Sequence, residues 1–179
     1  LNLINQKTIN WIQNFKSENE IIFNGNPIIL SNDNIIVSTN NNISLINQNG
    51  MRLWNLIISS NVPPKISGDT IFLIDKNNYL IFIDTKTGQI IFSKNIHLIL
   101  HEDYKKNFQK KIKKINHIFF IKNKLLLVSD NSYFIELNIK NSVNVSSIKK
   151  NSFRIASDII FIENEMILVS KTNRVYKIN

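Results

Sequence analysis

Residues 64–92 of this 179-residue chain, PKISGDTIFLIDKNNYLIFIDTKTGQIIF, contain the pattern that determines the fold. Four short apolar segments (PKI, TIFLID, YLIFID and QIIF) alternate with turns that contain Gly, Asn and Asp. These residue types tolerate positive φ or bond their own backbone. The two middle segments are apolar at nearly every position, which is typical of strands covered on both faces. The stretch therefore predicts a four-stranded unit packed between two neighbours.

The same pattern occurs earlier in the chain, over residues 27–54. Trp54 closes this first copy as Phe92 closes the second, at an offset of 38 residues. Two weaker copies follow over 115–145 and 155–179, and the last of them stops before an outermost strand. Four-stranded units stacked face to face are the blades of a β-propeller.

We therefore expect an all-β protein: a single β-propeller portion of about four four-stranded blades, part of an eight-bladed propeller, with one short helical insertion. The expected units are about 1–12 (the outer strand of a preceding or closing blade), 21–58, 62–96, 115–148 and 153–179, and the insertion spans 97–114. If the units close on themselves, residues 7–12 pair with 173–179. We favour the half-propeller, in which the two ends lie apart and an apolar blade face stays open.

The aromatic residues on the outer strands have a structural interpretation. A large ring there fills the gap between neighbouring blades and buries about 150–250 Å². A tight turn containing Gly brings the backbone of the next blade close to that ring. Because repeated positions usually serve packing, we expect the repeat signature to stabilise the fold; its residues are Trp11, Gly50, Trp54, Asp84, Thr87, Gly88 and Phe92.

This phrase, an acid followed by a Thr-Gly turn and an aromatic residue, resembles the pyrroloquinoline-quinone (PQQ) type propeller repeat. The resemblance is carried by Asp84, Thr87, Gly88 and Phe92, and in the first copy by Asn47, Gly50 and Trp54. That family contains quinone-dependent dehydrogenases and a non-catalytic, BamB-like branch of lipoproteins that assist outer-membrane β-barrel assembly.

The resemblance to the BamB-like branch implies a non-enzymatic scaffold of the bacterial cell envelope, periplasmic and associated with the outer membrane. Its partner would be a protein, an outer-membrane assembly component. Membrane contact would be peripheral, through segment 97–114 or an upstream lipid anchor. The alternatives are a quinone-dependent dehydrogenase-type enzyme and a self-standing four-bladed ligand-binding module.

Residues with catalytic or ligand-binding chemistry are sparse. The chain has no Cys, which excludes disulfides, thiolate metal sites and cysteine nucleophiles. The carboxylates lie mostly in predicted turns, apart from Glu136 in the strand YFIELN, and no calcium-loop or phosphate-loop spacing occurs. His97 and His101 are spaced for one face of a helix and are weak candidates for zinc ligands, but no third ligand is evident. We expect no catalytic residue, no cofactor and no metal.

Segment 97–114 holds six lysines and follows an amphipathic pattern, with apolar residues every four positions. It predicts a helix that projects from the rim of the propeller. Its basic face is either merely solvated or a docking surface for an acidic protein partner or anionic headgroups; the candidate residues are Lys105, Lys106, Lys110, Lys111, Lys113 and Lys114. Nucleic acid is not expected, because the net charge of +9 is dispersed and comes almost entirely from lysine.

Overall fold

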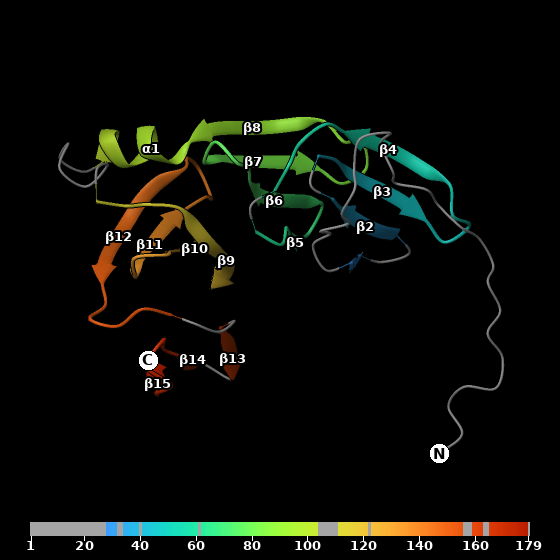
Figure 1. The fold of residues 1–179 in the computed structure, drawn as a ribbon. Helices are drawn as coiled ribbons and strands as arrows, with labels where there is room; N and C mark the ends of the chain where they lie inside the picture. Colours follow the sequence, from blue (N-terminus) through green and yellow to red (C-terminus); the bar gives the residue numbers. More distant parts are fainter. Residues whose placement is uncertain are drawn as a thin grey trace, which may run out of the picture.

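The computed structural model of the chain describes residues 28–31, 34–39, 41–60, 62–103, 111–121, 123–155, 159–162 and 165–178. These residues form antiparallel sheets that follow one another along the chain, together with one short helix, as the sequence predicts. In Figure 1 the sheets are arranged in an arc, from β1–β4 at one end to β13–β15 at the other.

The strands of the first two sheets are β1 (Ile29–Ser31), β2 (Asn34–Ser38), β3 (Ile43–Asn47), β4 (Arg52–Leu56), β5 (Lys65–Ser67), β6 (Thr70–Ile74), β7 (Tyr79–Asp84) and β8 (Ile90–Asn95). The third and fourth sheets contain β9 (Ile115–Ile121), β10 (Lys124–Ser129), β11 (Tyr133–Asn138), β12 (Asn144–Lys150), β13 (Ile160–Ile162), β14 (Glu165–Val169) and β15 (Val175–Ile178). Within each sheet, every strand pairs with its neighbour in sequence.

The apolar runs in β6 and β7 divide between two hydrophobic clusters. Successive side chains of a strand point to opposite faces. Ile71 and Leu73 therefore pack against the first sheet, whereas Phe72 and Ile74 pack against the third. A third cluster joins the third sheet to the fourth through residues such as Leu126. These two strands are apolar at nearly every position because both faces are buried, as the sequence predicts.

The two edges of the arc carry different loops. On one, which we call the connector rim, the turn between the second and third strands of a sheet meets the segment that links one sheet to the next. Asn78 there accepts a backbone hydrogen bond from Ile96 at 2.9 Å, and Ser132 accepts one from Asn151 at 3.0 Å. The opposite rim carries the remaining turns, such as Gly68–Asp69 and residues 84–88, where Thr85 donates to the carbonyl of Asp69.

Helix α1 (Ile96–Asp103) confirms a short helical insertion but differs from the expected helix over 97–114. Residues 111–114 are not helical, and 104–110 lie outside the described residues. The helix does not project from the rim, since Ile96, Ile99 and Leu100 are buried in the cluster between the second and third sheets. Ile112 is buried in the same cluster, so the chain must turn back to begin β9.

The fourth sheet has three strands within the described part of the chain, β13, β14 and β15. Trp11 lies outside the described residues, and so do residues 7–12, which would pair with 173–179 in the closed alternative. No helix among the described residues is long and apolar enough to cross a membrane.

Candidate functional site

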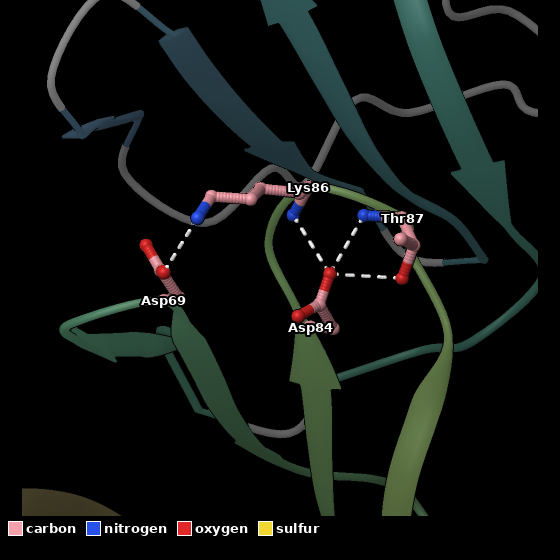
Figure 2. A network of polar contacts seen from close by, with 4 residues as sticks. All are labelled: Asp69, Asp84, Lys86 and Thr87. Carbon is pink, nitrogen blue, oxygen red and sulfur yellow. Dashed lines mark hydrogen bonds and ion pairs between the residues drawn. The ribbon is translucent and has the colours of Figure 1, made fainter.

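The Thr-Gly turn of the second sheet is held together by Asp84. Its Oδ1 atom accepts hydrogen bonds from the Thr87 backbone N–H at 2.7 Å, the Thr87 hydroxyl at 2.8 Å and the Lys86 N–H at 3.0 Å (Figure 2). The backbone donor of Thr87, followed by its hydroxyl, lowers the pKa of Asp84 below its ordinary value. Figure 2 also shows the Lys86 ammonium 2.8 Å from Asp69, an ion pair that is exposed to solvent. The polar residues of the motif therefore stabilise the conformation of the turn.

The ring of Trp54 packs directly on this turn from the neighbouring sheet. Its indole N–H donates to the carbonyl of Thr85 at 2.9 Å. Gly88 adopts φ +71°, and a Cβ atom built there would lie 2.8 Å from the Trp54 ring. Glycine is required for two reasons: the left-handed backbone and the close approach of the ring.

The other copies of this sequence motif have different residues at the same turn. In the first sheet Asn47 replaces the aspartate, and its Oδ1 accepts from the N–H of Asn49 at 3.0 Å and of Met51 at 2.9 Å. Between the second and third sheets, Phe92 and Val143 of the corresponding turn both pack against the hydrophobic cluster that the two sheets share. Of the signature residues, Trp54 and Gly88 meet directly at the contact between the first two sheets.

The contact between the second and third sheets, at Phe92, carries two open grooves. An open groove of about 650 Å³ runs between Phe92, Lys94 and the turn around Val143, and a second of about 580 Å³ lies near Phe72 and Phe120. Lys94 and Glu102 form an ion pair at the wall of the larger groove. Neither groove brings together a pair of carboxylates.

The predicted metal candidates remain apart from other ligands. His97 and His101 both lie on α1, and His117 stacks on Phe119 in β9. Within the described ranges, no group of three or more His, Asp or Glu side chains is placed to hold a metal ion. Glu136, the strand carboxylate, pairs with Lys124 at 3.2 Å and is partly exposed.

A basic surface lies on the connector rim of the third and fourth sheets. Four segments meet there: residues 111–114, the turn 130–132, the end of β12 with its connector to residue 155, and the turn 170–174. Asn131 donates a side-chain hydrogen bond to the carbonyl of Lys111, and Lys171 donates its N–H to the carbonyl of Arg154 at 2.8 Å. We call this surface the basic rim; its exposed cations are Lys111, Lys113, Lys114, Lys149, Lys150, Arg154, Lys171 and Arg174.

Seven of the eight cations of the basic rim have no carboxylate partner among the described residues. Asp130 is the one acidic residue of these four segments. Elsewhere in the described chain, lysines pair with acids, as in Lys86–Asp69, Lys124–Glu136 and Lys177–Glu165. Such ion pairs do not occur, among the residues that the structure describes, for Lys113, Lys114, Lys149, Lys150, Arg154, Lys171 or Arg174. Clustered charge of one sign creates a local potential that attracts anions and steers association.

Comparison with known proteins gives a match over part of the chain to one family. Residues 14–94 match the family model described as outer membrane protein assembly factor BamB. The resemblance to the PQQ-type, BamB-like propeller family is confirmed. A comparison with curated proteins gave no match.

The solved structures similar to this BamB-like chain share its fold at low sequence identity. BamB from Moraxella catarrhalis matches 85% of this chain with a TM-score of 0.65 and 10% identity. The computationally designed Ika8 protein matches 86% (TM-score 0.58, 10% identity), and the designed Ika4 protein matches 93% (TM-score 0.60, 11% identity). This chain spans 42% of the BamB chain, 45% of Ika8 and 98% of Ika4. Its fold is thus that of a BamB propeller fragment.

The lysine pattern of segment 97–114 predicted only part of the basic rim. Lys111, Lys113 and Lys114 belong to the predicted partner surface, whereas Lys105, Lys106 and Lys110 lie outside the described residues. The remaining five cations were missed, because they come from the two following units; they are Lys149, Lys150, Arg154, Lys171 and Arg174. The signal available in the sequence was their position, since each lies beside the same turn or connector of successive repeats.

Proposed function

We propose that this chain is a non-enzymatic protein-interaction scaffold of the bacterial cell envelope that assists outer-membrane β-barrel assembly. Localisation in the periplasm, at the outer membrane, is part of the proposal. Its support from similarity is the match of residues 14–94 to the model for the assembly factor BamB.

The single observation that carries the proposal is the basic rim. Eight exposed cations gather there around one acid, whereas the Asp84 turn and the grooves near Phe92 contain polar groups that already have partners. An unneutralised charged surface on a rigid arc is suited to docking a partner with an acidic surface. The partner predicted from this chemistry is an outer-membrane assembly component that presents Asp and Glu side chains to the rim.

The test compares two charge-reversal variants with the same change in net charge. Lys113→Glu/Lys149→Glu alters the basic rim, and Lys76→Glu/Lys140→Glu alters exposed lysines outside it. The wild-type chain should capture an identified outer-membrane assembly component from envelope extract and bind it again after purification. Binding should fall as salt rises from about 0.1 M to 1 M, because the Debye length shrinks from about 10 to 3 Å.

Binding of the purified partner should be lost in the rim variant and retained in the matched variant. Equal binding by both variants would overturn the docking surface. The absence of any such component from the captured proteins, with the chain folded, would overturn the assembly role.

A further inference from the structure

A small cavity of about 290 Å³ opens on the basic rim, between the connector that leaves the third sheet and the β14–β15 turn of the fourth. Its walls come from 152–154 on one side and 170–172 on the other, with Tyr176 beneath. The two walls are fixed to each other by the bridge between Ile155 and Ser170 and by the hydrogen bond from Lys171 to Arg154. The cavity is therefore a fixed part of the contact between the third and fourth sheets.

The floor of this cavity is a stack of two aromatic rings. The rings of Phe153 and Tyr176 stack with their centroids 3.8 Å apart and an interplanar angle of 15°. Both belong to the hydrophobic cluster that joins the third and fourth sheets. A ligand group lying against this floor would be apolar, since neither ring face offers a hydrogen-bond donor.

The polar groups of the wall divide into hydroxyls with internal partners and cations without an acidic partner among the described residues. The hydroxyls of Ser170 and Thr172 lie 2.9 Å apart, and Ser170 also accepts from the Arg174 N–H at 3.2 Å. Arg154 and Lys171, by contrast, are exposed cations with no acidic partner among the described residues. Among the residues that the structure describes, no acidic side chain lines the cavity. An anion between the two cations would receive charge-assisted hydrogen bonds.

We propose that this cavity binds an acidic side chain of a peptide segment, with an adjacent apolar side chain resting on Phe153 and Tyr176. Its volume is at the lower limit of ordinary small-molecule sites, which suits one anchoring residue better than a cofactor. The further cations of the rim, such as Lys149 and Lys150, favour a ligand with several spaced acids. The inference deepens the proposed function and rests on it for the identity of the partner.

The experiment uses calorimetric titration of the full chain with three short acetylated and amidated peptides. One contains a Leu–Glu pair, the second replaces Glu with Gln, and the third replaces Leu with Gly. The Leu–Glu peptide should bind most tightly, and each replacement should weaken binding by about tenfold, the effect of losing one charge-assisted or one apolar contact. Inorganic phosphate and heparin serve as competing anion sources.

The decisive variant is Arg154→Ala/Lys171→Ala, and its matched control is Lys76→Ala/Lys140→Ala, which removes two exposed lysines outside the basic rim. The cavity variant should bind the Leu–Glu peptide as weakly as the wild type binds the Leu–Gln peptide. The control should stay within about threefold of the wild type at 0.15 M salt, where distant charges are screened. Arg154→Lys should restore part of the affinity relative to Arg154→Ala, and urea midpoints verify that every variant is folded.

Equal binding of the Leu–Glu peptide by the wild type and the cavity variant would overturn the inference. So would equal affinity for the Glu and Gln peptides, or displacement of the peptide by phosphate at the same concentration. If the cavity variant binds the peptide normally while Lys113→Glu/Lys149→Glu loses the protein partner, the cavity is wrong and the docking surface holds. If instead the cavity variant loses the peptide while Lys113→Glu/Lys149→Glu still binds the protein partner, the cavity site holds and the docking surface is wrong.

Discussion

At the scale of single residues, each contact between sheets depends on a ring and the turn it covers. Trp54 contributes both an apolar surface and one hydrogen bond, to the carbonyl of Thr85. Because Gly88 has no Cβ atom, the Trp54 ring can pack against the turn. Asp84 fixes the conformation of the turn by accepting three hydrogen bonds.

Trp54→Ala should destabilise the chain by about 3 kcal/mol, the low end for removing a large aromatic side chain, because this ring is only partly buried. Trp54→Phe should cost about 1 kcal/mol relative to the wild type, since it keeps a ring and loses the hydrogen bond. Urea unfolding provides the free energies. Lys76→Ala, an exposed control, should change the free energy of unfolding by less than about 0.5 kcal/mol. A cost for Trp54→Ala as small as that of the control would show that the ring does not fill the seam.

Asp84 makes the free energy of unfolding depend on pH in the acidic range. Its pKa is lowered in the folded chain from the ordinary value of 3.8, mainly by the Thr87 N–H and hydroxyl. The carboxylate therefore stabilises the fold above the unfolded pKa, and this contribution disappears as the pH falls through the folded pKa. In Asp84→Asn, the urea midpoint should fall less between pH 6 and pH 3 than in the wild type. Identical pH dependence in the two proteins would contradict the assignment, and Asn47 shows that asparagine fits this turn.

At the scale of elements, the insertion shows how a local pattern can mislead. Apolar residues every four positions over 97–114 predicted one long helix, whereas α1 ends at Asp103 and residues 111–114 have another conformation. The periodicity could not reveal that the chain must return to start β9. The apolar residues of α1 itself, Ile96, Ile99 and Leu100, have helical spacing and are buried together.

Two leucines on α1 test whether this helix is packed or projects. Leu100 is 0% exposed and Leu98 is 54% exposed. Leu100→Ala should destabilise by about 2–5 kcal/mol through the lost burial and the cavity left behind. Leu98→Ala should cost less than about 0.5 kcal/mol in the same urea measurement. Equal costs would mean that α1 is not seated between the second and third sheets.

At the scale of the whole molecule, the sequence predicted the stacking of units and the rings between them, because turns and apolar runs recur at one period. The basic rim was not predicted as a unit, since Lys113, Lys150 and Arg174 are far apart in sequence and the stacking of sheets brings their segments together. The Phe153–Tyr176 floor was missed for the same reason.

The outer face of the fourth sheet should drive self-association of the isolated chain. Ile160 is 60% exposed and Val175 is 71% exposed, and the strand register places both on the face opposite to Leu168, which packs on the third sheet. Sedimentation velocity should show species that grow with protein concentration, as expected for an uncovered apolar sheet face. Ile160→Lys should shift the chain toward a monomer, whereas Leu98→Lys, on exposed α1 surface, should not. A wild-type monomer at every concentration would contradict this prediction.

The repeated Asp-Thr-Gly-aromatic motif joins neighbouring propeller units, which leaves the rim for binding. Nuclear magnetic resonance can test this role through Trp54, whose indole N–H donates to the carbonyl of Thr85 at 2.9 Å and whose ring contacts the position of Gly88. We expect nuclear Overhauser cross-peaks between the Trp54 ring and the Gly88 α-protons, together with slow exchange of the indole proton. A Trp54 indole that exchanges at the rate of free tryptophan, with no cross-peak to Gly88, would contradict it.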